Sequence, residues 1–88
     1  MSGKIHVTNL SWNTTDDDLR QAFQVYGQVV DVIVMKEGQT GRFQGFGFVT
    51  FGSQVEADNA IANMNDQELD GRRIKVTNAQ SSGGGGGG

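Results

Sequence analysis

Ten residues, Arg42 to Phe51, constrain the fold most strongly, because they read RFQGFGFVTF and set phenylalanines two apart between glycines. Side chains of a β-strand alternate between its two faces. One face would therefore carry Phe46, Phe48 and Thr50, and the other Gly45, Gly47, Val49 and Phe51. A core strand buried on both faces is the alternative, but such strands seldom set glycines beside their aromatics. The pattern favours a strand whose glycine side lies close to a helix or a neighbouring strand and whose aromatic side is open to a planar ligand.

Composition excludes several kinds of site. The length of 88 residues indicates one small domain, and the net charge of -3 argues against indiscriminate phosphate binding unless basic residues gather on one face. It has no cysteine, so disulfides, thiolate metal sites and thiol catalysis are excluded, and the single histidine, His6, cannot build a zinc site alone. Asp16, Asp17 and Asp18 lack the glycine-hinged loop of a calcium site. We therefore expect neither a metal nor another cofactor.

No apolar run approaches the roughly 18 residues that a membrane helix needs, and the N-terminus lacks the apolar segment of a signal peptide. These features predict a soluble, intracellular protein that does not bind membranes. From Gln80 onward the chain consists of polar residues and six glycines, which predicts a disordered tail over 80–88 after a domain over 1–79.

Hydrophobic periodicity predicts four strands and two helices. Strands are expected at Lys4–Thr8, Val29–Met35, within Arg42–Phe51 and at Arg73–Thr77. Thr15 with Asp18 is a weak capping box for a first helix that Gly27 would stop, and Ser53 with Glu56 is a better box for a second helix ending near Asn65. Loops are expected over 9–15, with Trp12, and over 66–71, with Leu69 packed beneath it. The order β-α-β-β-α-β is a split β-α-β fold of class α+β, one antiparallel sheet with both helices on one face.

Strand alternation predicts which side chains lie on the sheet face that the helices leave open. They are Lys4, His6, Thr8, Ile33, Met35, Gln44, Phe46, Phe48, Thr50, Arg73, Lys75 and Thr77. This set contains no carboxylate, because the acidic residues considered fall on the helices or, like Asp66, in a distal loop. Aromatic rings beside cationic side chains are what single-stranded nucleic acid binds.

The segment QGFGFVTF resembles the octamer motif of the RNA recognition motif family and matches it at seven of eight positions. Ile5 to Leu10 resembles the hexamer of that family, and the likeness runs over residues 4–79. The whole pattern is most similar to glycine-rich RNA-binding proteins, so the glycine tail is expected to be a shortened one. The resemblance implies a ribonucleoprotein role such as mRNA processing, in the nucleus or the cytoplasm, for a monomeric domain.

By this resemblance, His6 and Phe48 would stack bases and Phe46 would contact a sugar. The other binding positions implied are Lys4, Asn9, Met35, Arg42, Gln44, Arg73, Lys75, Asn78 and Gln80. Two positions depart from the family. Gln44 stands where the octamer opens with Lys or Arg, which removes a phosphate contact that Arg42 would replace in part. His6 stands where Phe or Tyr is usual, and its smaller ring weakens one platform.

Some positions keep two interpretations. His6 is either a stacking residue or an ordinary surface residue of a strand, and Trp12 is either packed on the nearby helix, which is favoured, or at the edge of the RNA surface. Arg72 and Arg73 are either binding residues or the solvated start of a strand, and only Arg73 is counted as binding.

Three function classes are compatible with this strand and helix order. An RNA-binding module is favoured, with single-stranded DNA left open as a ligand. A protein-interaction domain of the same fold usually lacks the sheet aromatics, and an enzyme such as an acylphosphatase needs a nucleophile or base with an oriented partner, which this sequence lacks. The sequence therefore predicts a binding domain and no catalytic residue.

Overall fold

The structure is a computed structural model that describes residues 2–11, 13–37 and 44–79. The predictions made for Trp12, Arg42, Gln80 and the glycine tail lie outside these residues.

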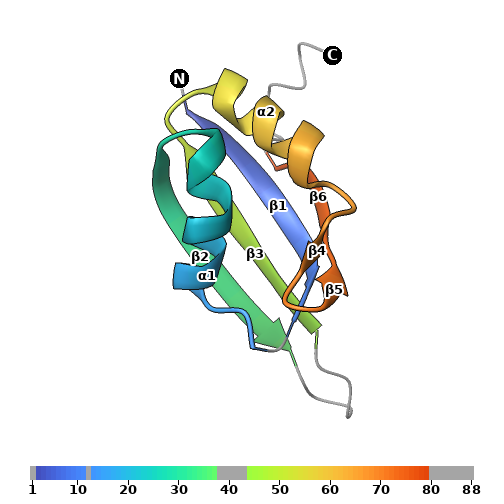
Figure 1. Cartoon of the computed structure of the whole chain (residues 1–88). Coiled ribbons are helices and arrows are strands. Elements are labelled where there is room, and N and C mark those ends of the chain that lie inside the picture. The colour runs from blue at the N-terminus through green and yellow to red at the C-terminus, as the bar shows by residue number, and fades with distance from the viewer. Residues whose placement is uncertain (1, 12, 38–43, 80–88) are drawn as a thin grey trace.

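Four strands form the main sheet, in the order β2-β3-β1-β6 (Figure 1). Their bounds are β1 Gly3–Leu10, β2 Val29–Glu37, β3 Gln44–Phe51 and β6 Lys75–Asn78, and neighbouring strands are antiparallel. Helix α1 (Asp16–Phe23) packs on β2 and β3, and α2 (Gln54–Met64) packs on β1, β3 and β6. Both helices lie on the same face of the sheet (Figure 1). The predicted split β-α-β fold is confirmed.

The core lies between the helices and the sheet. Its buried members include Ile5, Val7, Leu10, Leu19, Phe23, Val49, Phe51, Ala57, Ala60, Met64, Ile74 and Val76. Every strand residue in this group points to the helix side, in the period-2 pattern that the sequence predicts except at Leu10, which follows an irregularity in β1. Phe51 is fully buried, with its ring centroid 6.5 Å from that of Phe23.

The glycines of β3 permit close packing, as predicted. A Cβ at Gly47 would lie 2.5 Å from the carbonyl oxygen of Ile33 in β2 and 3.3 Å from Leu19 Cδ2 in α1. A Cβ at Gly45 would lie 3.0 Å from Leu10 Cβ. Glycine at these positions therefore brings β3 close to its neighbours and leaves its side-chain volume to Phe46 and Phe48 on the other face.

The helix ends differ from the prediction in detail. The weaker box is complete, because Thr15 Oγ1 accepts from Asp18 N–H and Asp18 Oδ2 accepts from Thr15 N–H. Ser53 Oγ accepts from Glu56 N–H, but Glu56 accepts from Gln28 N–H and so does not complete a box with Ser53.

Gly27 ends the helical segment as predicted, but the α-helical part of that segment stops earlier. The α-helix ends at Phe23 and continues as a 3₁₀ turn, η1 (Gln24–Tyr26), after which Gly27 is extended with φ 168°. Its small size matters for packing as well, since a Cβ there would lie 2.5 Å from Glu56 Cβ.

The C-terminal strand prediction is wrong at its start. Arg73 belongs to β5 (Arg72–Arg73), which pairs with β4 (Glu68–Leu69) in a separate two-stranded ribbon. The predicted loop over 66–71 therefore contains a strand. The ribbon turns at Asp70 and Gly71, whose φ values are 54° and 84°. Leu69 packs against the core, as expected.

Strand β1 is longer than predicted and reaches Leu10, so the following loop is shorter. The pairing with β3 is irregular between Val7 and Leu10, where Asn9 adopts a left-handed φ of 62°. Asparagine tolerates this conformation better than most residues, which suits it to the irregularity.

Candidate nucleic-acid interface

The open face of the sheet carries one continuous row of side chains across all four strands. Ile33 lies opposite Phe48, Phe48 opposite His6, and His6 opposite Thr77. Residues directly opposed in antiparallel strands point to the same face. The row therefore places the two aromatic residues at the centre of the face, on the two inner strands.

The rings of this face are already assembled. His6 and Phe48 are stacked, with centroids 4.7 Å apart and planes 19° apart, and Phe46 meets His6 edge-on at 6.0 Å. Each of the three side chains is half-buried. We call His6, Phe46 and Phe48 the aromatic triad. Because His6 and Phe48 cover part of each other, a base would stack on the surface that the pair leaves open.

A cation lies beside the triad. Lys4 is two residues before His6 on the same face of β1, and its Nζ lies 5.2 Å from the centroid of the Phe48 ring. This distance is within the range of a cation–π contact. A nucleic-acid strand bound across the rings would find the Lys4 ammonium in position to contact a phosphate.

Strand β2 extends the face with apolar side chains. Ile33 is 39% exposed and Met35 is 44% exposed, and Met35 lies opposite Phe46. Both were predicted on this face, and Met35 was also predicted to contact RNA.

The open face also carries a carboxylate, which corrects the prediction that it has none. Asp31 lies opposite Thr50, which lies opposite Lys4. Asp31 lies two and four residues before Ile33 and Met35, so strand alternation places all three side chains on the same face. The sequence alone could therefore have predicted this carboxylate. It places a negative charge at the end of the face that carries Lys4.

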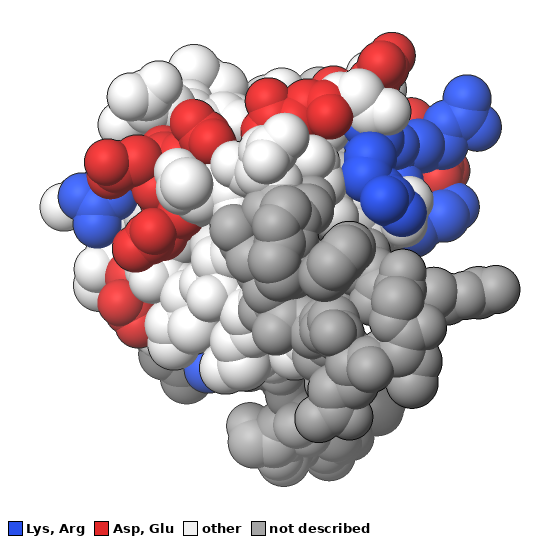
Figure 2. Space-filling view, turned by 90° about the horizontal axis from the view of Figure 1, so that it is seen from below, with Lys and Arg blue, Asp and Glu red and all other residues white. Residues whose placement is uncertain are grey.

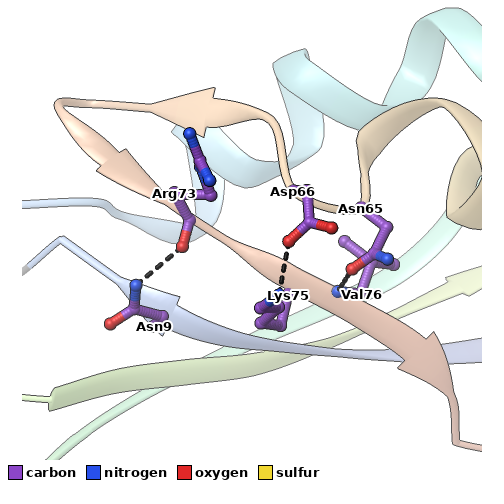
Figure 3. Close-up of polar contacts among 6 residues, drawn as sticks. All are labelled: Asn9, Asn65, Asp66, Arg73, Lys75 and Val76. Atoms are coloured by element: carbon purple, nitrogen blue, oxygen red, sulfur yellow. Dashed lines mark hydrogen bonds and ion pairs between the residues drawn. The ribbon is translucent and has the colours of Figure 1, made fainter.

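Lys75 is on the open face by register, since it lies opposite Thr8, but its charge is already paired. Lys75 Nζ contacts Asp66 Oδ1 at 2.5 Å (Figure 3). The hydrogen bond from Lys75 lowers the pKa of the Asp66 carboxyl; desolvation opposes this change, and the charges of Lys75 and Arg73 lower the pKa further. Asp66 was predicted to lie in a distal loop, so its contact with a binding candidate was missed.

Asn9 connects the end of β1 to the β4–β5 ribbon. Its Nδ2 donates to the carbonyl oxygen of Arg73 at 2.6 Å, and its Oδ1 accepts from Arg72 at 2.8 Å (Figure 3 shows the first bond). The side chain amide thus positions both arginines of β5 beside β1. Arg72 was set aside in the sequence analysis, and only the folded structure shows that a polar residue holds it.

The remaining binding candidates are placed as follows. Asn78 is the exposed last residue of β6. It lies opposite Ile5, whose side chain points to the helix side of the sheet. Gln44 begins β3. Arg73 is exposed and lies in the ribbon rather than in the main sheet.

Charge is segregated at the end of the molecule that Figure 2 shows. Lys and Arg gather on the side where the β4–β5 ribbon and β6 lie in Figure 1, and most visible Asp and Glu lie elsewhere. Arg72, Arg73 and Lys75 are the exposed basic residues of these elements.

Two other kinds of feature are absent from the described part of the chain. Within it, no group of three or more His, Cys, Asp or Glu side chains is arranged to hold a metal ion. None of its helices combines the length and the apolar character needed to cross a membrane.

Comparisons with known proteins show which family this chain resembles. The model of the RNA recognition motif family matches residues 5–75. Glycine-rich RNA-binding protein 1 of Mycosarcoma maydis is 62% identical over 90 residues, covering 100% of this chain and 51% of that protein. Glycine-rich RNA-binding protein 2 of Sorghum bicolor is 55% identical, covering 88% of this chain and 46% of that protein. The chain thus spans about half the length of these relatives.

Solved structures show the same fold. The crystal structure of RNA binding protein PG1 superposes with a TM-score of 0.78 at 37% identity, covering 89% of this chain and 94% of that one. The second RNA recognition motif domain of yeast poly(U)-binding protein gives a TM-score of 0.74 at 38% identity, covering 88% and 93%.

Proposed function

The chain belongs to the RNA recognition motif family, and from this premise we propose that it binds single-stranded RNA on the open face of its sheet. One observation carries the proposal. The aromatic triad stands preassembled at the centre of a face that neither helix covers, with the Lys4 ammonium beside it. Exposed rings next to a cation suit the stacking of bases and the contact with phosphates.

We assign roles by position in the triad. His6 and Phe48 stack bases, and Phe46 contacts a sugar at the edge of the pair. Lys4 contacts phosphate, and Met35 adds an apolar contact on the β2 side. The remaining assignments are kept as flanking contacts, namely Asn9, Arg42, Gln44, Arg73, Lys75, Asn78 and Gln80.

A preference for RNA over DNA would come from the contact that Phe46 makes with a sugar, because the 2′-hydroxyl of the sugar is the group that distinguishes RNA from DNA. We propose RNA as the natural ligand, bound by a monomeric domain in the nucleus or the cytoplasm and without a metal. The match and the relatives indicate a binding domain rather than an enzyme. A protein-interaction role is disfavoured, since the aromatic triad is present and accessible.

A binding titration tests the proposal. Fluorescence anisotropy with a labelled, mixed-sequence 8-mer of single-stranded RNA is expected to give a Kd on the order of micromolar or weaker. The weakness follows from the small ring of His6, the absence of a basic side chain at Gln44 and the net charge of -3. The matching DNA 8-mer measures the preference for RNA.

Two variants test whether the RNA binds at the aromatic triad. Phe48→Ala is expected to weaken binding by about 1–3 kcal/mol, the value of one stacked base. Val55→Ala is the control, because Val55 is 77% exposed on α2, away from the sheet face. Equal affinities for the two variants, or nanomolar binding of the unselected RNA by the wild type, would contradict the proposal.

A further inference from the structure

The outer edge of β6 is closed by the residues that follow α2. Asn65 Oδ1 accepts from Val76 N–H at 2.9 Å, Asp66 N–H donates to the carbonyl oxygen of Ile74 at 2.9 Å, and Ile74 N–H donates to that of Gln67 at 2.9 Å. Figure 3 shows the bond between Asn65 and Val76, next to the ion pair of Asp66 with Lys75. Residues 65–67 therefore run along the edge of the sheet where an unpaired strand would otherwise face solvent.

This arrangement fixes where the Asp66 carboxylate lies. The backbone of Asp66 is held in the left-handed region, with φ 68°, and its amide is bonded to Ile74. The side chain meets Lys75 from the outer edge, on the side of β6 opposite to β1. Lys75 is thereby drawn toward the edge of the sheet and away from the aromatic triad.

Resting on the proposed function, we infer that Asp66 is an affinity-determining residue that competes with RNA phosphate for Lys75. A carboxylate and a phosphate are both anionic acceptors of charge-assisted hydrogen bonds from a lysine ammonium. Lys75 and Asp66 keep 58% and 50% of their side-chain surface exposed, so a phosphate can reach the ammonium without disturbing the core. A phosphate that approaches the Lys75 ammonium meets the Asp66 carboxylate beside it, so the two anions repel each other and the phosphate contact is weakened while the ion pair persists.

The proposal predicts the effect of freeing Lys75. Asp66→Asn retains the shape of the side chain and a residue type that tolerates positive φ, so the backbone of residues 65–67 is expected to persist. Affinity for the single-stranded RNA 8-mer should rise about two- to fivefold, the range that exposed ion pairs produce. The slope of log Kd against log salt should steepen by about 0.7, which corresponds to one more phosphate neutralised on a single strand.

A charge-matched control separates this competition from a general change of charge. Asp58→Asn removes one negative charge from α2, on the helix side of the sheet, and an asparagine there can still accept the hydrogen bond from Gln54. It should leave the salt slope unchanged. A second variant, Lys75→Gln, should weaken binding more in the Asp66→Asn background than in the wild type, because only there is the ammonium available without competition.

The experiment is the anisotropy titration of the four single and double variants and the wild type at several salt concentrations. A steeper slope and higher affinity for Asp66→Asn, lost when Lys75→Gln is added, would support the competition. Equal gains for Asp66→Asn and Asp58→Asn, or additive effects of the Asp66 and Lys75 changes, would overturn it. Wild-type protein that binds no RNA at all would instead refute the proposed function, and NMR spectra of the variants would show whether each is folded.

Discussion

Phe48 and Phe51 lie three residues apart in the same strand, yet they take opposite roles because they point to opposite faces of the sheet. Phe51 is fully buried against the helices, with Phe23 nearby. Phe48 is half-buried on the open face, where its neighbours are the ring of His6 and the ammonium of Lys4. The same side chain thus stabilises the fold at one position and is available to a ligand at the other.

This difference predicts the stability of two variants. Phe51→Ala should lower the free energy of unfolding by about 3–5 kcal/mol, because it leaves a cavity in the core. Phe48→Ala should lower it by only about 0.5–1.5 kcal/mol, the value of an aromatic pair such as the one it makes with His6. Urea denaturation followed by circular dichroism measures both. Equal losses for the two variants would show that the assignment of faces is wrong.

Individual side chains differ in how far the sequence could place them. The triad followed from period-2 alternation alone, and Asp31 was accessible by the same rule although it was omitted. The pairing of Asp66 with Lys75 was not accessible, because it depends on a left-handed backbone at Asp66 and on the course of residues 65–67 along β6. The link from Asn9 to Arg72 and Arg73 likewise depends on a ribbon with no clear hydrophobic pattern.

At the scale of elements, β3 is shaped by the two glycines that alternate with its aromatics. A Cβ at Gly47 would come within 2.5 Å of a backbone carbonyl oxygen of β2, and a backbone atom cannot move aside as the end of a flexible side chain can. Glycine here therefore fixes the distance between the two strands that carry Phe48 and Ile33.

We expect Gly47→Ala to destabilise the domain by about 1–3 kcal/mol, as overpacking does in close-packed sites. Gly52→Ala is the matched control, because a Cβ there would meet only the Glu56 carboxylate at 3.4 Å and the Gln28 side chain at 4.0 Å. Thermal melts of both variants give the comparison. A Gly47→Ala protein as stable as Gly52→Ala would mean that the close approach of β2 to β3 does not constrain this position.

Elements with strong periodicity were predicted correctly, namely the four main strands, the two helices and their order. Elements that depend on backbone geometry were not. The β4–β5 ribbon has two residues in each strand, too few to show alternation, and it is set by the positive φ values at Asp70 and Gly71. The end of α1 was assigned to Gly27 by its residue type, whereas packing against Glu56 accounts for that glycine.

At the scale of the whole molecule, the two sides of the sheet differ in charge and in the kinds of side chain that they present. The helices cover one side of the sheet and carry carboxylates such as Asp16–Asp18 and Asp58, while the other side presents rings and a lysine. A net charge of -3 is compatible with binding to an anionic ligand, because Lys4 lies beside the triad and Arg72, Arg73 and Lys75 gather on the side where β6 and the ribbon lie. Asp31 and Asp66 are exceptions that limit the affinity rather than the location of binding.

The central claim is that RNA binds the open face of the sheet and leaves the helices free. NMR titration of the isotopically labelled chain with a mixed-sequence 8-mer of single-stranded RNA tests it most directly. The largest shifts of amide signals are predicted in β1 around His6 and in β3 around Phe46 and Phe48, with the exposed positions of α1 and α2 unchanged. Shifts concentrated on the helices, or saturation of the RNA without change in β1 and β3, would contradict the account.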